Sequence, residues 1–239
     1  MGGRVGSITT EIIADGLVFN FDAANRASYP TQKTFAISES GSCFNTLDLT
    51  QSGSFISDPQ FITQPVSASC FSFDGVDDYI SLDQEFDATN GLTWSSWIKY
   101  DKSTTTGLNW LCSSRDSSGG TKSQFHTRLV GGQYGGGWFN YFNGGATSTG
   151  IDGLGDNNWH NIVQTVNYSN GDVKFYKDAV VSSTVMTWGS DYSTAIVKQI
   201  STSFNPFKGD VASVQFYTKT LSANEVLHNY NALKGRFGL

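Results

Sequence analysis

The chain has 239 residues and a formal net charge of −6; only 15% of its residues are charged, while 26 are glycine and 14% are aromatic. This composition excludes a coiled coil or helical bundle, which needs many Ala, Glu, Lys and Leu residues. It also excludes a disordered chain, because so many aromatic residues can form a large core. Aromatic residues fit pleated sheets and glycine fits turns, so an all-β protein is favoured. The acidic charge disfavours a nucleic-acid partner, and without an apolar run of about 18 residues no membrane insertion is expected.

A glycine-containing lead-in over residues 1–16 precedes the first strand signal, an alternation of apolar and other residues at 17–22. Residues 26–69 are rich in Ser, Thr, Gln and Pro and predict long loops with short strands. Denser alternation then predicts strands at residues 71–73, 79–82, 92–100, 110–113, 124–130, 138–142, 159–168, 172–177, 180–188, 196–201 and 211–217. In the strand at 92–100, one face should carry Leu92, Trp94, Ser96, Ile98 and Tyr100. Such spacing is typical of a sandwich or barrel, and no composition shift marks a linker. We therefore expect one domain over residues 17–239, with residues 1–16 as an attachment segment.

A tight turn is expected at Asn170-Gly171, which lies between two alternating runs. Both residues tolerate positive φ, and this dipeptide is the strongest short signal for a β-hairpin. The hairpin should join the strands predicted at residues 159–168 and 172–177.

One short helix is expected near the end of the chain. Ser222 and Glu225 have the spacing of a capping box, in which each side chain accepts from the backbone amide of the other residue. Leu221 and Val226 occupy the hydrophobic-staple positions, and an apolar stripe at helical spacing follows. Gly235 suits the left-handed position after the helix. We expect this helix to lie against the sandwich as a structural element.

Cysteine usage gives no sign of a metal site. Cys43, Cys70 and Cys112 are odd in number and lack metal-ligand spacing, which favours buried thiols and leaves a Cys43–Cys70 bridge open. Residues 1–10 lack the apolar core of a signal peptide. We expect a protein made in a cytoplasm, with no export signal of its own.

Several segments resemble the laminin-G-like, or concanavalin-A-like lectin/glucanase, superfamily. They lie in the family's order along the chain: Gly-Leu-Val-Phe-Asn-Phe-Asp-Ala-Ala-Asn at 16–25, Phe-Asp-Gly-Val-Asp-Asp-Tyr-Ile at 73–80, Leu-Thr-Trp-Ser-Ser-Trp-Ile-Lys at 92–99, Asn-Trp-His-Asn-Ile-Val at 158–163, Phe-Lys-Gly-Asp-Val at 207–211 and the ending at 229–237. The resemblance implies a jelly-roll β-sandwich of two antiparallel sheets with one short C-terminal helix. Family members often have Asp-Gly where this chain has Asp178-Ala179, and the segment 41–54 departs from the family's usual loop.

The opening and ending motifs together look most like a version of this domain found in structural proteins of tailed bacteriophages, notably those of marine cyanobacteria. That narrower resemblance implies a virion protein. Its partners would be other virion proteins, such as the capsid or an appendage, and further copies of the same chain. Its location would be the virion, after synthesis in the host cytoplasm.

Glycanases on this fold use two Glu residues on one strand face, two to four residues apart, as nucleophile and acid. This chain has only Glu11, Glu39, Glu85 and Glu225, and no two of them are close in sequence. No nucleophile elbow or zinc-protease motif appears either. We therefore expect that the chain is not an enzyme and has no catalytic residues.

Calcium is the most plausible ligand chemistry in the sequence, because it prefers carboxylate and carbonyl oxygens. Candidate ligands are Asp74, Asp77 and Asp78 in one turn, and Asp152 and Asp156 in another. Neither group follows the EF-hand spacing. The alternative in both places is a turn-forming Asp, whose carboxylate accepts from local backbone amides. No cofactor is required by this interpretation, and calcium is the one candidate.

A run of glycines and aromatic residues at 131–145 could contact a glycan or a protein partner. Its candidate residues are Tyr134, Trp138, Asn140, Tyr141 and Asn143, which could stack on a sugar and form hydrogen bonds. The alternative is a mobile hairpin flanked by a core strand. The leading hypothesis for the whole chain is a non-enzymatic phage virion subunit, a capsid decoration or surface appendage. The second hypothesis is a carbohydrate-binding adhesin that engages host-surface glycans.

Overall fold

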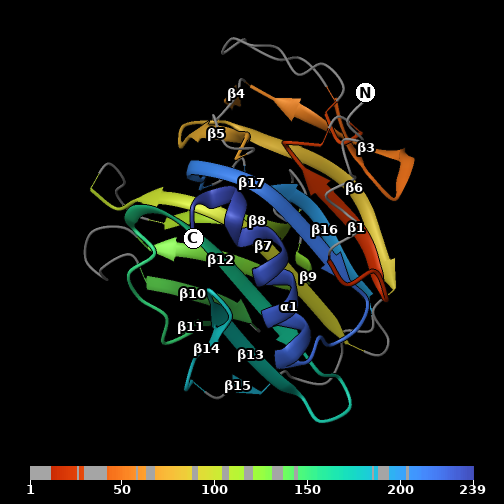
Figure 1. Cartoon of the computed structure of the whole chain (residues 1–239), viewed down its shortest axis with the longest axis vertical. Coiled ribbons are helices and arrows are strands. Elements are labelled where there is room, and N and C mark those ends of the chain that lie inside the picture. Colours follow the sequence, from red (N-terminus) through yellow and green to blue (C-terminus); the bar gives the residue numbers. More distant parts are fainter. Residues whose placement is uncertain are drawn as a thin grey trace, which may run out of the picture.

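Two antiparallel β-sheets stack against each other in the structure, a computed structural model, and one helix lies outside them (Figure 1). The structure describes residues 12–25, 27–29, 42–57, 59–62, 68–87, 91–103, 108–115, 121–130, 137–142, 145–184, 186–187, 194–202 and 205–239. The predicted all-β architecture, with one short C-terminal helix, is confirmed.

Within the described residues, the first sheet has nine strands. A path of seven runs through β14 (Val180–Val181), β13 (Asp172–Lys177), β12 (Asp156–Val166), β7 (Leu92–Asp101), β17 (Lys208–Tyr217), β5 (Cys70–Asp74) and β4 (Gln60–Ile62). Off this path, β1 (Leu17–Asp22) pairs with β17, and β15 (Met186–Thr187) pairs with β13. The central strand β7 is paired along most of its length with both β12 and β17.

The second sheet has eight strands in the part of the chain that the structure describes. Their spatial order is β11 (Gly145–Ser148), β10 (Gly137–Phe142), β9 (Thr121–Val130), β8 (Leu108–Arg115), β16 (Thr194–Ile200), β6 (Tyr79–Asp87), β3 (Asp48–Ile56) and β2 (Ser42–Asn45). Its neighbours pair antiparallel throughout. The segment 26–69, predicted to hold short strands, contributes β2, β3 and β4.

The main core fills the space between the two sheets. Side chains alternate along β7, so Trp94, Ile98 and Tyr100 all point into this core, as the period-2 pattern predicted. Trp97 points to the opposite face of the sheet, where it is also fully buried. The second sheet meets them with apolar side chains from β3, β6, β8 and β16: Phe55, Ile80, Leu82, Leu111 and Ile200. Burying one such side chain contributes about 1.5–3 kcal/mol, so this layer holds the sheets together.

Part of the outer face of the first sheet is buried under the C-terminal helix α1 (Ala223–Leu233) and the short 3-10 helix η3 (Lys234–Phe237). Figure 1 shows α1 crossing the strands of this sheet, on the side away from the second sheet. Phe237 stacks on Trp97 with ring centroids 4.1 Å apart, and Tyr230 stacks on the same indole at 5.6 Å. This second packed layer explains why both faces of β7 are buried.

The capping box of α1 is confirmed. The Ser222 hydroxyl accepts from the Glu225 amide at 3.3 Å, and the Glu225 carboxylate accepts from the Ser222 amide at 2.8 Å. Leu221 and Val226 lie in one buried cluster, as the staple requires. The predicted ending is wrong, because the left-handed residue is Gly238, with φ 76°, and not Gly235. The stacking of Phe237 on the sheet keeps the chain helical for one more turn.

Two predictions for the β12–β13–β14 region need correction. The hairpin at 166–172 exists, but only Gly171 has positive φ, and the Gly171 amide donates to the Asn167 carbonyl. The single strand predicted at 180–188 is instead two short strands, β14 and β15. Between them the Ser182 hydroxyl donates to the Thr149 carbonyl and accepts from the Thr184 amide. Such local bonds compete with a strand ladder and interrupt it.

The segment before β1 packs onto the domain. Ile12 is buried against the cluster under η3, and the Ile13 amide donates to Asn229 of α1 at 2.8 Å. The ending motif also contacts the opening motif. The Arg236 guanidinium donates to both carboxylate oxygens of Asp22, at 2.8 and 2.9 Å. Residues 1–11 lie outside the described part, so the attachment role of 1–16 stays a prediction.

Cys43 and Cys70 are free thiols, so the bridge left open between them does not form. Both are buried, and burial raises the pKa of Cys43 to about 12 and that of Cys70 still further. At neutral pH both side chains therefore act as small apolar groups.

Candidate functional site

The acidic turn between β5 and β6 brings Asp74, Asp77 and Asp78 together. Their carboxylates each place an oxygen within 4.8 Å of the others, with Asp78 buried and the other two exposed. The Asp78 carboxylate accepts from the Asp74 amide at 2.9 Å, and the Asp74 carboxylate accepts from the Val76 amide at 2.7 Å. These bonds are those of turn-forming Asp residues, and they leave carboxylate oxygens that could hold a cation.

The two Asp residues of the second candidate group lie apart from this turn and have other contacts. Asp156 accepts from the Asn158 amide and bonds the His160 ring at 3.1 Å. Asp152 is exposed, and its backbone carbonyl accepts from Lys177 at 3.2 Å. Among the described residues, neither Asp belongs to a group of three His, Cys, Asp or Glu side chains whose ligand atoms all lie within 4.8 Å of one another.

His160 lies between two carboxylates at the end of the first sheet. Its Nδ1 is 2.7 Å from Asp178 and its Nε2 is 3.1 Å from Asp156. Burial disfavours the charged imidazole, but the hydrogen bond and charge of Asp178, with help from Asp156, raise the pKa of His160 above 6.5. Both ring nitrogens are therefore engaged in holding the β12 end to the turn after β13.

The aromatic run at 131–145 falls largely outside the description. Tyr134 and Asn143 lie outside the described residues. Trp138, Asn140 and Tyr141 lie on β10, between β9 and β11 in the second sheet. Their place on a strand near one end of that sheet is established, while their role as contacts stays a prediction.

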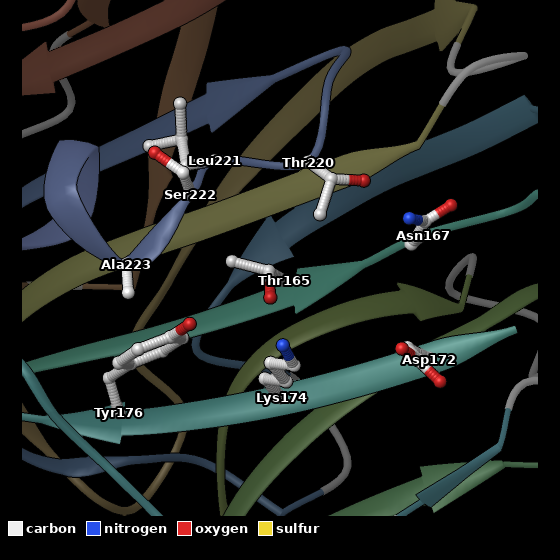
Figure 2. A pocket seen from close by; sticks show the side chains of 9 residues that line it. All are labelled: Thr165, Asn167, Asp172, Lys174, Tyr176, Thr220, Leu221, Ser222 and Ala223. Carbon is white, nitrogen blue, oxygen red and sulfur yellow. The ribbon is translucent and has the colours of Figure 1, made fainter. Parts of the chain in front are cut away.

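A polar pocket that the sequence did not predict lies on the outer face of the first sheet. Strands β12 and β13 and the segment leading into α1 enclose a cavity of about 210 Å³ (Figure 2). We call it the β12–β13 pocket, and its lining is Thr165, Asn167, Asp172, Lys174, Tyr176, Thr220, Leu221, Ser222 and Ala223.

The floor of the β12–β13 pocket is rigid. Thr165 is 1% exposed and Tyr176 is 2% exposed, and their side chains share a hydrogen bond. Burial raises the pKa of the Tyr176 phenol, so it stays protonated at neutral pH. The Thr220 hydroxyl at the rim donates to the Val166 carbonyl at 2.6 Å, which fixes its rotamer and leaves its lone pairs free to accept. A pocket with such fixed polar groups is preorganised for a ligand.

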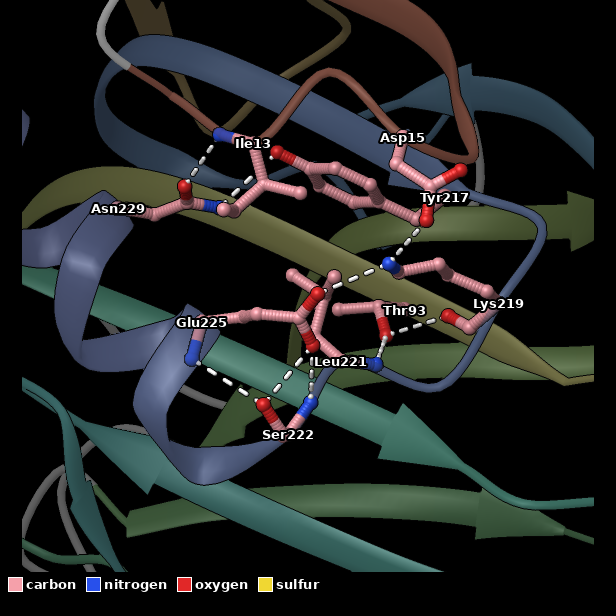
Figure 3. Close-up of polar contacts among 9 residues, drawn as sticks. All are labelled: Ile13, Asp15, Thr93, Tyr217, Lys219, Leu221, Ser222, Glu225 and Asn229. Carbon is pink, nitrogen blue, oxygen red and sulfur yellow. Dashed lines mark hydrogen bonds and ion pairs between the residues drawn. The ribbon is translucent and has the colours of Figure 1, made fainter.

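The wall beside α1 is fixed by a second network (Figure 3). Lys219 donates to Asp15 at 2.6 Å and to Glu225 at 2.8 Å, while Glu225 is also bound by Ser222 of the pocket lining. The Thr93 hydroxyl donates to the Lys219 carbonyl and accepts from the Leu221 amide. The segment 219–222 is thereby held from both sides.

Sequence reasoning missed this pocket because its residues are spread over three segments. The signal available in the sequence was the alternation along β13, where the outward-facing Asp172, Lys174 and Tyr176 alternate with apolar residues. Outward polar residues are ordinary on a half-buried strand. Only the arrival of the segment before α1 beside them turns this face into a pocket.

No helix among the described residues has the length and apolar character needed to cross a bilayer. A search of curated protein sequences gives no match to the chain.

Solved structures similar to this chain include lectin-like and enzymatic proteins. The Trypanosoma rangeli sialidase in complex with sialic acid is 12% identical with a TM-score of 0.61, covering 92% of this chain and 33% of the sialidase chain. Botulinum neurotoxin type C, whose cell entry depends on two ganglioside molecules, is 13% identical with a TM-score of 0.61. The match covers 95% of this chain and 53% of the neurotoxin chain. The binding domain of botulinum neurotoxin DC in complex with SialylT is 12% identical with a TM-score of 0.61. The match covers 92% of this chain and 52% of that chain. The chain thus spans about a third to a half of these proteins, and the likeness shows the fold.

The sialidases among these structures contradict the expectation that the chain is not an enzyme. That expectation rested on the absence of the two-Glu pair and of other catalytic motifs, whereas this fold also occurs within chains named as sialidases. The pointer to an enzyme is weak, because the identity is 11–13% in these cases and the chain covers only a third of each sialidase chain. It assigns no reaction and no catalytic residue to this chain.

The family is shown by the sequence itself. The laminin G-type model described as the concanavalin A-like lectin/glucanases superfamily matches residues 74–227, nearly two thirds of the chain. This match extends from the acidic turn to the middle of α1 and includes the whole β12–β13 pocket. The chain therefore belongs to the concanavalin A-like lectin/glucanases superfamily.

Proposed function

We propose that the chain is a carbohydrate-binding domain and that a sugar unit binds in the β12–β13 pocket. The observation that carries this proposal is the preorganised polar pocket itself, with its buried Thr165 and Tyr176 floor. Similar solved structures that bind gangliosides or SialylT support it at the level of the fold.

The chemistry of the lining suits a sugar. Hydroxyl groups of Thr220 and Ser222 keep lone pairs that can accept from sugar hydroxyls, and the Asn167 amide and Lys174 ammonium can donate to sugar oxygens. At about 210 Å³ the cavity is smaller than the roughly 300–1,000 Å³ sites of drug-sized ligands, which fits one sugar unit and not a long chain.

The test is a glycan array followed by a substitution that fills the pocket. Ala223 lines the pocket at an exposed position in the first turn of α1, so Ala223→Trp should block the cavity without removing a buried group. Leu227→Trp, one turn further along and 47% exposed, is the matched control outside the pocket. We expect glycan binding that is lost in Ala223→Trp and kept in Leu227→Trp. Binding that survives in both variants would place the sugar elsewhere, and no binding to any glycan would refute the proposal.

The aromatic run at 131–145 is the alternative contact surface for a glycan or a protein partner. Exposed aromatic residues suit either kind of partner. Loss of glycan binding in Tyr134→Ala or Trp138→Ala, with Ala223→Trp unaffected, would favour this surface. The reverse pattern would favour the β12–β13 pocket.

We further propose that the acidic turn of Asp74, Asp77 and Asp78 binds calcium. The proximity of the three carboxylates supports it. Calcium that binds the folded state should raise the melting temperature, and chelation should reverse the effect. Asp77→Asn should abolish this response, while Asp152→Asn, at an exposed Asp outside the cluster, should keep it. A melting temperature that does not respond to millimolar calcium would contradict the proposal.

We also propose the finer role of a tailed-phage virion subunit, a capsid decoration or surface appendage that self-associates. The opening and ending motifs that carry this resemblance form one unit, because Arg236 binds Asp22 through two hydrogen bonds. A decoration subunit could also bind glycans, so the two roles are compatible. Mass spectrometry of purified virions is the test, and absence of the chain from mature particles would refute this role.

A further inference from the structure

The distribution of charge in the β12–β13 pocket indicates which sugars it prefers. Lys174 is exposed on the outward face of β13, and it forms no ion pair or hydrogen bond with any residue in the described part of the chain. Other lysines on this side of the molecule are engaged: Lys219 binds Asp15 and Glu225, and Lys177 donates to two backbone carbonyls. The Lys174 side chain is therefore a positive charge at the pocket with no ion-pair partner in contact among the described residues, in a chain whose net charge is −6.

The ammonium of Lys174 lies in the middle of the pocket. Figure 2 shows it between Tyr176 and Asp172 along β13, with its nitrogen directed toward Thr165 on the neighbouring strand. A ligand that rests on the Thr165–Tyr176 floor would therefore meet the ammonium directly.

Asp172 is the opposing charge in the lining and decides where an anion can go. Its carboxylate lies at the other end of the pocket from Tyr176 (Figure 2) and accepts from the Asn170 side chain at 3.0 Å. A negative group on the ligand would be repelled from that end and attracted to the end near Tyr176 and Ser222. The first turn of α1 also favours an anion there, but Glu225 in the same turn offsets it, so the argument rests on Lys174.

We propose that the β12–β13 pocket prefers a sugar that carries a carboxylate, with that carboxylate bound to Lys174. The proposal rests on the proposed carbohydrate-binding function and adds the ligand class. The sugar hydroxyls face Thr220, Asn167 and Asp172, and the carboxylate faces the Lys174 ammonium. A charge-assisted hydrogen bond of this kind is about twice as strong as a neutral one.

The test compares two sugars that differ only in the carboxylate, methyl β-glucuronide and methyl β-glucoside, by titration of the full chain followed by NMR or calorimetry. Because the lysine is exposed and solvent screens its charge, we expect the glucuronide to bind about three- to ten-fold more tightly at low salt. The preference should shrink in 0.5 M salt. Acetate at the same concentration is the control for a simple anion, and it should bind much more weakly than the glucuronide.

Three substitutions in the pocket should change the preference for the glucuronide in different ways. Lys174→Gln should remove the preference, Lys174→Arg should keep it, and Asp172→Asn should increase it by removing the repelling carboxylate. Lys102→Gln, at an exposed lysine outside the pocket lining, is the charge-matched control and should change nothing. Thermal melts should show that all four variants remain folded, since every substituted side chain is exposed.

The outcomes separate this inference from the proposed function. If both sugars bind equally in the pocket, the carboxylate preference is refuted and carbohydrate binding stands. If the glucuronide is preferred but Lys174→Gln does not alter the preference, or if acetate binds equally well, the inference is also refuted. If neither sugar binds and a glycan array is negative, the proposed function fails and the inference fails with it.

Discussion

The turn between β13 and β14 holds a residue in a conformation that its side chain disfavours. Asp178 and Ala179 have φ values of 52° and 64°, so this two-residue turn places both residues in the left-handed region. Asp tolerates that conformation because its short polar side chain can bond locally, and here the Asp178 carboxylate accepts from the Asn161 amide at 2.9 Å. Ala has no such compensation. The Asp-Gly sequence common at this place in the family would remove the strain, so we predict that Ala179→Gly stabilises the protein.

The size of the effect follows from three contributions. Relief of the left-handed conformation stabilises by about 1–2 kcal/mol. The extra freedom of Gly in the unfolded chain costs about 0.4–1 kcal/mol. The Ala179 methyl group also packs partly against the cluster that contains Tyr176, and losing half of such a contact costs about 0.4 kcal/mol. The net gain is about 0.5 kcal/mol, or about 1–2 °C in melting temperature for a domain of this size.

Urea unfolding, with melting temperature as a second readout, measures this difference. Gly153→Ala is the matched reverse substitution, because Gly153 has φ 71° and an added Cβ would meet only the Lys177 nitrogen, at 3.4 Å. It should destabilise by about 1 kcal/mol, since it adds the left-handed cost without a steric clash. If Ala179→Gly lowers stability while Gly153→Ala behaves as expected, the strain at residue 179 has been overestimated and the packing of its methyl group dominates.

Three other predictions follow from buried or paired groups. Arg236→Ala should lower the free energy of unfolding by about 3 kcal/mol in urea denaturation, because it leaves the buried Asp22 carboxylate without its cation; a loss below about 1 kcal/mol would contradict this. The stability difference between the wild type and His160→Gln should be largest below pH 6.5 and should shrink as pH rises through the raised pKa of His160. The reason is that protonation of the histidine favours the folded state. A stability difference that is constant from about pH 5.5 to 8.5 would refute this prediction. In a variant without the third cysteine, the thiols of Cys43 and Cys70 should react with a thiol reagent only at the rate of unfolding, since both are buried and burial raises their pKa; rapid labelling of the native protein would be the contrary result.

Periodicity in the sequence predicted most of the fold. The alternation along β7 assigned Trp94 and Ile98 to one face, and the capping box placed the start of α1 at the correct residue. Both patterns are local, so they can be read without knowing the partners. The end of the helix could not be predicted in this way, because it depends on Phe237 stacking on Trp97, some 140 residues earlier in the chain.

The candidate site was predictable only where its residues are adjacent in sequence. Asp74, Asp77 and Asp78 belong to one turn, so their proximity followed from the sequence. The β12–β13 pocket combines Thr165, Lys174 and residues near Thr220, which come together only through the pairing of β12 with β13 and the return of the chain after β17. Nothing in the local pattern of any one segment indicates a cavity.

The location of the pocket follows from how the outer face of the first sheet is covered. Over most of β7 and β17 this face is buried, because Trp97 and Tyr217 pack under the C-terminal helices. Val163 of β12 and Tyr176 of β13 still pack against Val226 of the helix, but at Thr165 and Lys174, beyond the start of the helix, the face is polar. Because the helix covers only part of this sheet face, a recess remains beside the start of the helix. The polar side chains in this recess keep their hydrogen-bonding capacity and their access to solvent. The same helix that completes the second packed layer therefore also forms one wall of the pocket, so substitutions that loosen its capping box should weaken ligand binding as well as stability.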